Sequence, residues 1–214
     1  MQFSNSLVPA RLWYEKCCFY NENVCQRAIE MTNEINLCFV DCTKAFGRIV
    51  HNELIHLLDD LNLDDKDLRL IQSLYYDQAA VIRVRNETSH SVEIERGVRQ
   101  GCVLSPDLFS VYSEVLINAL EDLNGVSVGG VNMNNLRYAD DTVLMAKTEE
   151  DLQNLVNRLD QISRDSGIEI NIKKTEVMTV SKRTVKPDCK IFLNGRQLKQ
   201  AEHFKYLGCI IADD

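Results

Sequence analysis

The sequence predicts an α+β fold in which helices pack on an antiparallel β-sheet. Some segments carry apolar residues at helical spacing, whereas others are short apolar runs of strand length. The two kinds of segment follow one another without strict alternation, which favours α+β over a parallel, doubly wound sheet. With 214 residues, 45% of them hydrophobic and 26% charged, the chain can bury the core of one domain, or of one domain plus a fragment.

The first regular elements are a strand and two helices. Residues 35–41 form an apolar run that ends on Asp41, which predicts a buried strand. Residues 52–61 and 65–76 each carry apolar side chains three and four positions apart, the pattern of an amphipathic helix. We expect the paired acids at the ends of these helices to be solvated.

A hairpin and a third helix are predicted next. Residues 80–84 and 91–95 read as two strands joined by a polar turn. Ser105 is a suitable N-cap, Pro106 suits the first helical position, and Gly125 can close the helix.

The last third of the chain is predicted to hold a strand pair, a helix and further short strands. Apolar residues flank the tetrapeptide 138–141 on both sides, and Thr148 begins a capping pattern for a helix that ends at Gly167. The predicted strands are residues 131–136, 142–146, 168–180, 190–193 and 203–211.

Composition excludes several classes of protein. No apolar stretch approaches the roughly 20 residues that span a bilayer, and the N-terminus lacks the pattern of a secretory signal. The eight cysteines form no zinc-binding pattern and are expected to be reduced thiols that fill core positions. The chain is therefore expected to be intracellular and not secreted, with nucleus and cytoplasm both open.

The net charge of −8 is unevenly distributed along the chain. Residues 167–206 contain nine Lys or Arg and four acids, so this segment carries +5 and the remainder carries −13. A basic segment of this kind could follow a phosphate backbone, and a solvated surface explains it equally well.

Asp140 and Asp141 form the most informative feature of the sequence. Two adjacent carboxylates between apolar strands repel each other, and a divalent cation is the usual reason to keep them there. Asp41 also ends a strand, so one antiparallel sheet could bring all three acids together. Such a site suits two Mg²⁺ ions, for which Mn²⁺ could substitute, and in-line phosphoryl transfer. The alternatives are unrelated strand-end acids or another two-metal nucleotidyltransferase, such as a cyclase.

The loop before the third helix could also bind a ligand. Gly97 and Gly101 allow close approach of the backbone, and Arg99 and Gln100 add a cation and an amide that could meet a triphosphate or a base. A plain loop before a well-capped helix is the alternative.

Five blocks, in this order, resemble the reverse-transcriptase domain of non-LTR (LINE-type) retrotransposons of the endonuclease–reverse transcriptase kind. They are Phe39–Phe46, Arg96–Ser113, Tyr138–Asp141, Gly167–Glu176 and Phe204–Gly208. The resemblance covers roughly residues 35–211. It implies a right-hand polymerase palm with an antiparallel sheet and packed helices, and with fingers and thumb largely missing.

The resemblance also implies an organisation of the chain. Residues 1–34 would be a divergent remnant of the fingers, residues 35–180 the palm, and residues 181–214 primer-grip strands that stop before the thumb. The implied activity is RNA-directed DNA polymerisation, with two Mg²⁺ ions as cofactors and with an RNA template, a DNA primer and dNTPs as partners.

Roles for individual residues follow from the resemblance. Asp41 and Asp140 would be the principal metal ligands and Asp141 a supporting one, and Lys174 would donate a proton to pyrophosphate. Phe46 would exclude a 2′-hydroxyl, with a core phenylalanine as the alternative. The remaining implied site residues are Arg99, Gln100 and Gly101 for the nucleotide, and Tyr206, Leu207 and Gly208 for the primer.

One departure from the family pattern concerns Gly47, which stands where the family usually has an acid after the aromatic residue. This acid is not the metal ligand, so its loss is compatible with metal binding. Together with the unfamiliar N-terminus, it motivates a second hypothesis. In that hypothesis the chain is a truncated or decayed retrotransposon fragment without catalysis, which could self-associate or act as a protein-interaction module through surfaces that fingers and thumb would cover.

Overall fold

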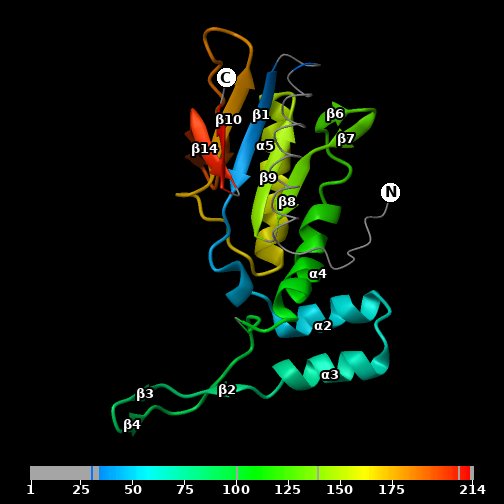
Figure 1. Cartoon of the computed structure of the whole chain (residues 1–214), viewed down its shortest axis with the longest axis vertical. Coiled ribbons are helices and arrows are strands. Elements are labelled where there is room, and N and C mark those ends of the chain that lie inside the picture. The colour runs from blue at the N-terminus through cyan, green and yellow to red at the C-terminus, as the bar shows by residue number, and fades with distance from the viewer. Residues whose placement is uncertain (1–29, 31–33, 100, 139, 207, 213–214) are drawn as a thin grey trace. The chain divides into compact units, whose positions relative to one another are not determined.

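The computed structural model describes residue 30 and residues 34–99, 101–138, 140–206 and 208–212 (Figure 1). The expected N-terminal segment, 1–34, lies almost wholly outside them. The chain divides into two compact units. The first contains residues up to 41, 120–158 and those from 171 onward, and the second contains residues 42–119 and 159–170.

A five-stranded sheet forms the centre of the first unit. Its strands lie in the order β13-β10-β1-β9-β8, and all neighbouring pairs are antiparallel except β10 and β13. Figure 1 shows β1 between β10 and β9. The strands span Lys199–Gln200 (β13), Glu176–Ser181 (β10), Glu34–Val40 (β1), Asp141–Ala146 (β9) and Asn135–Tyr138 (β8).

The central strand β1 is almost completely buried, as its apolar sequence requires. From Ile35 to Val40 every residue is at most 5% exposed. Phe39, Val143 and Met178 come from three neighbouring strands and share one hydrophobic cluster with the aromatic residue Tyr206. Burying apolar area on both faces stabilises the sheet, so β1 fixes the positions of the strands on either side of it.

Three small hairpins and a helix complete the first unit. The helix α5 (Glu149–Asp165) continues into the second unit and begins as predicted, because the Asp151 N–H donates a 3.0 Å hydrogen bond to Thr148 Oγ1. The hairpins are β6 (Val126–Val128) with β7 (Val131–Met133), β11 (Phe192–Leu193) with β12 (Arg196–Gln197), and β14 (His203–Tyr206) with β15 (Cys209–Ala212).

The second unit is mainly helical. A short 3₁₀ turn, η1 (Ala45–Gly47), precedes α2 (His51–Asp60) and α3 (Asp65–Tyr75), and α4 (Ser105–Asn118) follows a long hairpin. The hairpin contains two ladders, β2 (Ala79–Ala80) with β5 (Val92–Glu93) and β3 (Arg83–Val84) with β4 (Glu87–Thr88). Figure 1 shows it extending away from α2 and α3. The predicted helices and the hairpin are therefore confirmed, although Glu87–Thr88, which lie in the predicted turn, form the strand β4.

Two expectations about α4 are wrong. Ser105 is the first residue of the helix, not its cap, and its hydroxyl donates back to the Arg99 carbonyl at 2.6 Å. The helix ends at Asn118, well before Gly125. Gly125 instead lies against the backbone of Met133 and Asn134, where any Cβ would clash. Its role is close packing before β6 rather than helix termination.

The predicted long strand at residues 168–180 is also wrong in its first half. Ile170 makes only an isolated bridge, to Cys42, and β10 begins at Glu176. Alternating isoleucines at 168, 170 and 172 imitate a strand, whereas local hydrogen bonds to Asn171 turn the chain at residues 171–175.

Two further findings concern composition. Within the described parts of the chain, no helix is long and apolar enough to cross a membrane. Cys38, Cys102 and Cys189 are free thiols, and Cys38 and Cys189 are buried. This agrees with the expected core role for these two residues.

The glycine pair at η1 provides a stability test. Gly47 has no positive φ, and a Cβ there would meet nothing within 4 Å, whereas Gly97 has φ +92° and a Cβ there would lie 3.1 Å from the Gly47 Cα. We expect Gly47→Ala to raise the free energy of unfolding by about 0.4–1 kcal/mol, because it restricts only the unfolded chain. Gly97→Ala, the matched control, should lower it by more than about 1 kcal/mol. Urea unfolding measures both, and equal effects would contradict the prediction.

Candidate functional site

Asp41 follows directly after β1 and is held by its backbone from two sides. Its N–H donates to Thr175 Oγ1 at 3.3 Å, and its carbonyl accepts from the Asn171 N–H at 2.8 Å. Thr175 is 1% exposed, so this hydroxyl is a buried part of the structure. The strand and the turn at residues 171–175 together fix the backbone position of Asp41, from which its carboxylate extends.

Asp140 and Asp141 lie at the turn between β8 and β9. Tyr138 pairs with Asp141, so Asp140 lies in the tight connection between the two strands. Ala139 and the side chain of Tyr138 lie outside the described residues. Because Val40 of β1 pairs with Thr142 of β9, Asp41 and Asp141 occupy the same end of adjacent strands.

The electrostatics of Asp141 reflect this crowding of acids. Partial burial raises the pKa of its carboxyl first, and the carboxylates of Asp140 and Asp41 raise it further. The three predicted acids therefore lie close enough to influence one another. A bound cation would favour their ionised forms.

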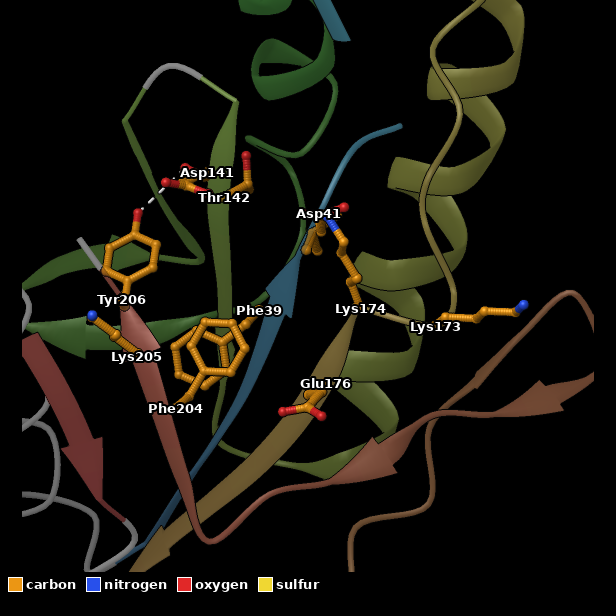
Figure 2. Close-up of a pocket in the computed structure, with 11 residues that line it drawn as sticks. Phe39, Asp41, Asp141, Thr142, Lys173, Lys174, Glu176, Phe204, Lys205 and Tyr206 are labelled. Atoms are coloured by element: carbon orange, nitrogen blue, oxygen red, sulfur yellow. Dashed lines mark hydrogen bonds and ion pairs between the residues drawn. The ribbon is translucent and has the colours of Figure 1, made fainter. Parts of the chain in front are cut away.

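A pocket of about 430 Å³ opens beside the acids (Figure 2). Within it the Lys174 Nζ lies 3.6 Å from Asp41 Oδ1, and the two side chains are 68% and 35% exposed. An ion pair as exposed as this one contributes little to stability. The pocket is lined by Phe39, Val40, Asp41, Asp141, Thr142, Lys173, Lys174, Glu176, Phe204, Lys205 and Tyr206.

The hairpin β14–β15 is attached to the acid-bearing strands by aromatic side chains. Phe204 stacks on Phe39 of β1, with ring centroids 4.1 Å apart and planes 10° apart. The buried Tyr206 hydroxyl donates to the Asp141 carbonyl at 3.3 Å. Gly208 has φ +77°, as the tight turn of this hairpin requires, and Leu207 lies outside the described residues. The structure thus brings Tyr206 to the carboxylates.

The predicted nucleotide residues belong to the second unit. Phe46 is half-buried and stacks on Phe109 of α4, with centroids 4.4 Å apart. The Arg99 side chain is exposed, and Gly101 has φ +81°. Gln100 is not among the described residues. The role of Phe46 at the sugar and the approach of these residues to the carboxylates stay predictions.

The carboxylates fit a hard divalent cation in the chemistry of their donor atoms. They supply only oxygen donors, which Mg²⁺ prefers, and Asp41 and Asp141 face one pocket. Among the side chains that the structure describes, no three acids, histidines or cysteines converge closely enough to hold a metal ion. An ion bound here would be held by Asp41, Asp140 and Asp141 after their carboxylates turn toward it.

Sequence reasoning missed the residues that support the site. Phe39 and Phe204 were read only as parts of motifs, although their stacking joins two distant strands. Asn171 and Thr175 were assigned to a strand, although they anchor Asp41. The run of four consecutive polar residues at 173–176, which breaks the apolar alternation, is the signal that could have identified the turn.

The sequence matches the family described as reverse transcriptase (RNA-dependent DNA polymerase) over residues 11–211. The chain therefore belongs to the reverse transcriptase family, and within it to the non-LTR retrotransposon kind, as the resemblance predicted. Solved structures agree on the fold. Apo telomerase from Candida tropicalis superposes with a TM-score of 0.66 at 10% identity, over 97% of this chain and 36% of that one.

Relatives with assigned names are polyproteins and polymerases of mobile elements. The Pol polyprotein of retrotransposable element R2 from Popillia japonica is 30% identical, over 81% of this chain and 30% of its own length. The corresponding R2 polyprotein of Nasonia vitripennis is 27% identical, over 81% and 18%. The RNA-directed DNA polymerase of mobile element jockey from Drosophila funebris is 27% identical, over 88% and 21%. The chain thus spans less than a third of the length of these relatives.

Proposed function

We propose that this chain is the palm of an RNA-directed DNA polymerase, which transfers a nucleotide from a dNTP to a primer 3′-hydroxyl on an RNA template. The observation that carries the proposal is the placement of Asp41 and Asp140–Asp141 at one end of adjacent strands, in a chain of this family. Two divalent ions at these carboxylates would activate the 3′-hydroxyl and stabilise the charge of the leaving pyrophosphate.

The residues of the chain have separate tasks in this proposal. Asp41 and Asp140 act as the principal carboxylate ligands, and Asp141 supports them. Tyr206, Leu207 and Gly208 position the end of the primer. The Tyr206 hydroxyl donates to the Asp141 backbone carbonyl, so one hydrogen bond links the residue that positions the primer to a residue that supports the metal ligands. A misplacement of about 1 Å in such an arrangement costs on the order of 10²-fold in rate.

Other residues bind the incoming nucleotide and donate the proton in this proposal. Phe46, held by its stack on Phe109, excludes a 2′-hydroxyl from the bound sugar. Arg99, Gln100 and Gly101 contact the triphosphate and the base. Lys174 presents an ammonium beside Asp41, from which its Nζ can pass a proton to the departing pyrophosphate.

Part of the basic C-terminal segment is already neutralised by the chain's own acids. Arg183 pairs with Glu34, Lys190 with Asp188, and Lys199 with Glu176. These pairs weaken the case for this segment as a continuous phosphate track. The proposal therefore rests on the carboxylates and the primer hairpin, not on charge.

Primer extension on poly(rA)–oligo(dT), first with Mg²⁺ and then with Mn²⁺, tests the proposal. We expect dTTP incorporation by the chain and none by Asp41→Asn, which keeps the shape of the side chain and removes its charge. Circular dichroism shows that both proteins are folded. A folded chain without incorporation above the variant would contradict the proposal.

That negative outcome would favour an interaction module. Its supporting observation is the exposure of apolar residues on the hairpin of the second unit, where Ile82 is 70% exposed and Val84 64%. Sedimentation of the same sample at high concentration would then detect self-association.

A further inference from the structure

Lys174 forms an ion pair with Asp41. Its Nζ lies 3.6 Å from the Asp41 carboxylate, in the pocket where the proposed ion would bind. Lys173 is adjacent in sequence and lines the same pocket, but Figure 2 shows it pointing away from Asp41. The contact is therefore a property of one lysine and not of a diffuse basic surface.

Backbone hydrogen bonds around Lys174 fix the position from which its side chain extends to Asp41. Asn171 closes the turn, since its carbonyl accepts from the N–H groups of Lys174 (3.1 Å) and Thr175 (2.9 Å). The same turn is hydrogen-bonded to both sides of Asp41, by the Asn171 N–H and the Thr175 hydroxyl. The base of the Lys174 side chain thus has a fixed position relative to the carboxylate that its ammonium meets.

We propose that the turn at residues 171–175 holds Lys174 as a displaceable counter-ion of Asp41, so that Lys174 competes with the divalent cation and sets its affinity, with Thr175 as a positioning residue. The inference rests on the proposed metal site. An ammonium is a point charge on a flexible stem, and at 68% exposure it can move into solvent when a divalent ion arrives. On leaving Asp41 it is free to meet the phosphates of the reactants.

Competition predicts a specific effect on metal affinity. Removal of the Lys174 charge should tighten cation binding about two- to fivefold, which corresponds to the free energy of an exposed ion pair. Removal of a nearby charge that does not touch Asp41 should change affinity less, because solvent and salt screen it.

Titration of the complete chain with Mn²⁺, followed by the electron paramagnetic resonance signal of the free ion, measures this affinity directly and needs no turnover. The variant Lys174→Met is compared with Lys173→Met as its matched control. We expect Lys174→Met to bind Mn²⁺ about two- to fivefold more tightly than wild type, and Lys173→Met to change affinity less than twofold. Equal effects of the two variants, or weaker binding by Lys174→Met, would overturn the proposal.

The role of Thr175 is tested in the same titration. Thr175→Val removes the hydroxyl that accepts from Asp41, whereas Thr175→Ser keeps it. Thr175→Val should tighten Mn²⁺ binding when Lys174 is present and have no effect in the Lys174→Met background, and Thr175→Ser should behave as wild type. A change of the same size in both backgrounds would show that Thr175 does not act through Lys174.

Wild-type behaviour separates this inference from the proposed function. If the wild-type chain binds no Mn²⁺ at millimolar concentration, the metal site itself fails, and both proposals fail with it. If wild type binds Mn²⁺ and Asp41→Asn does not, while the two lysine variants are indistinguishable, only the inference about Lys174 fails.

Discussion

Asp140→Ala is expected to lower the rate of nucleotide incorporation by on the order of 10³-fold, because it removes a principal carboxylate from the proposed metal site. Asp141→Asn should lower the rate by only about 10–100-fold, the range typical of groups that support metal ligands. The loss of rate is expected to be smaller for Asp141 because the proposal makes Asp140 a principal metal ligand and Asp141 a supporting one. It is measured by primer extension under single-turnover conditions, with Mn²⁺ affinity determined in parallel.

A charge-matched control separates this effect from a change in net charge. Asp188→Asn removes one acid that is 73% exposed and pairs with Lys190 near the surface. It should leave incorporation within twofold of wild type, about the effect of one screened surface charge. Equal losses for Asp140→Ala and Asp141→Asn would show that the two carboxylates are equivalent ligands, against the proposed division of roles.

Phe39→Ala is expected to lower the free energy of unfolding by about 3–5 kcal/mol, because it empties a large volume in the core. The Phe39 side chain is 1% exposed and stacks on Phe204, and Tyr206 lies beside it with ring centroids 6.2 Å apart. For a chain of this length the loss corresponds to a fall in the melting temperature of roughly 6–20 °C. Urea and thermal unfolding measure both quantities.

Phe192→Ala is the matched control, because it makes the same chemical change at a ring that is 47% exposed. It should cost less than about 1 kcal/mol. If the two substitutions cost the same, the Phe39–Phe204 stack is not part of a packed core. Phe39→Leu, which keeps most of the apolar volume, should fall between them.

Local patterns in the sequence predicted most elements of the fold. The strand at residues 35–41 is an apolar run of strand length, the helices near residues 52–76 repeat the helical period, and the hairpin at residues 80–95 has two short strand-like runs around a polar turn. The carboxylate pair was also visible locally, because charge between apolar strands is costly. The approach of Asp41 to this pair is an inference about topology, and the register of β1 with β9 places Asp41 and Asp141 at the same end of adjacent strands.

Contacts between distant segments were not predictable in the same way. Nothing in the sequence around Phe39 indicates that Phe204 stacks on it, because the contact depends on how the hairpin β14–β15 packs. The turn at residues 171–175 was misread because alternating isoleucines outweighed the polar residues between them. Its conformation depends on hydrogen bonds to Asp41, which lies more than a hundred residues earlier.

The order in which the sheet is assembled has a consequence for synthesis of the chain. Asn36 in β1 pairs with Ala146 in β9, and Glu34 pairs with Ser181 in β10. At translation rates of about 5–20 residues per second, β1 leaves the ribosome roughly 5–20 s before the first of these partners exists. During that interval its apolar residues have no native neighbour in the sheet. The buried central strand of the sheet is therefore an element that needs protection, for example by a chaperone, while the chain is being made.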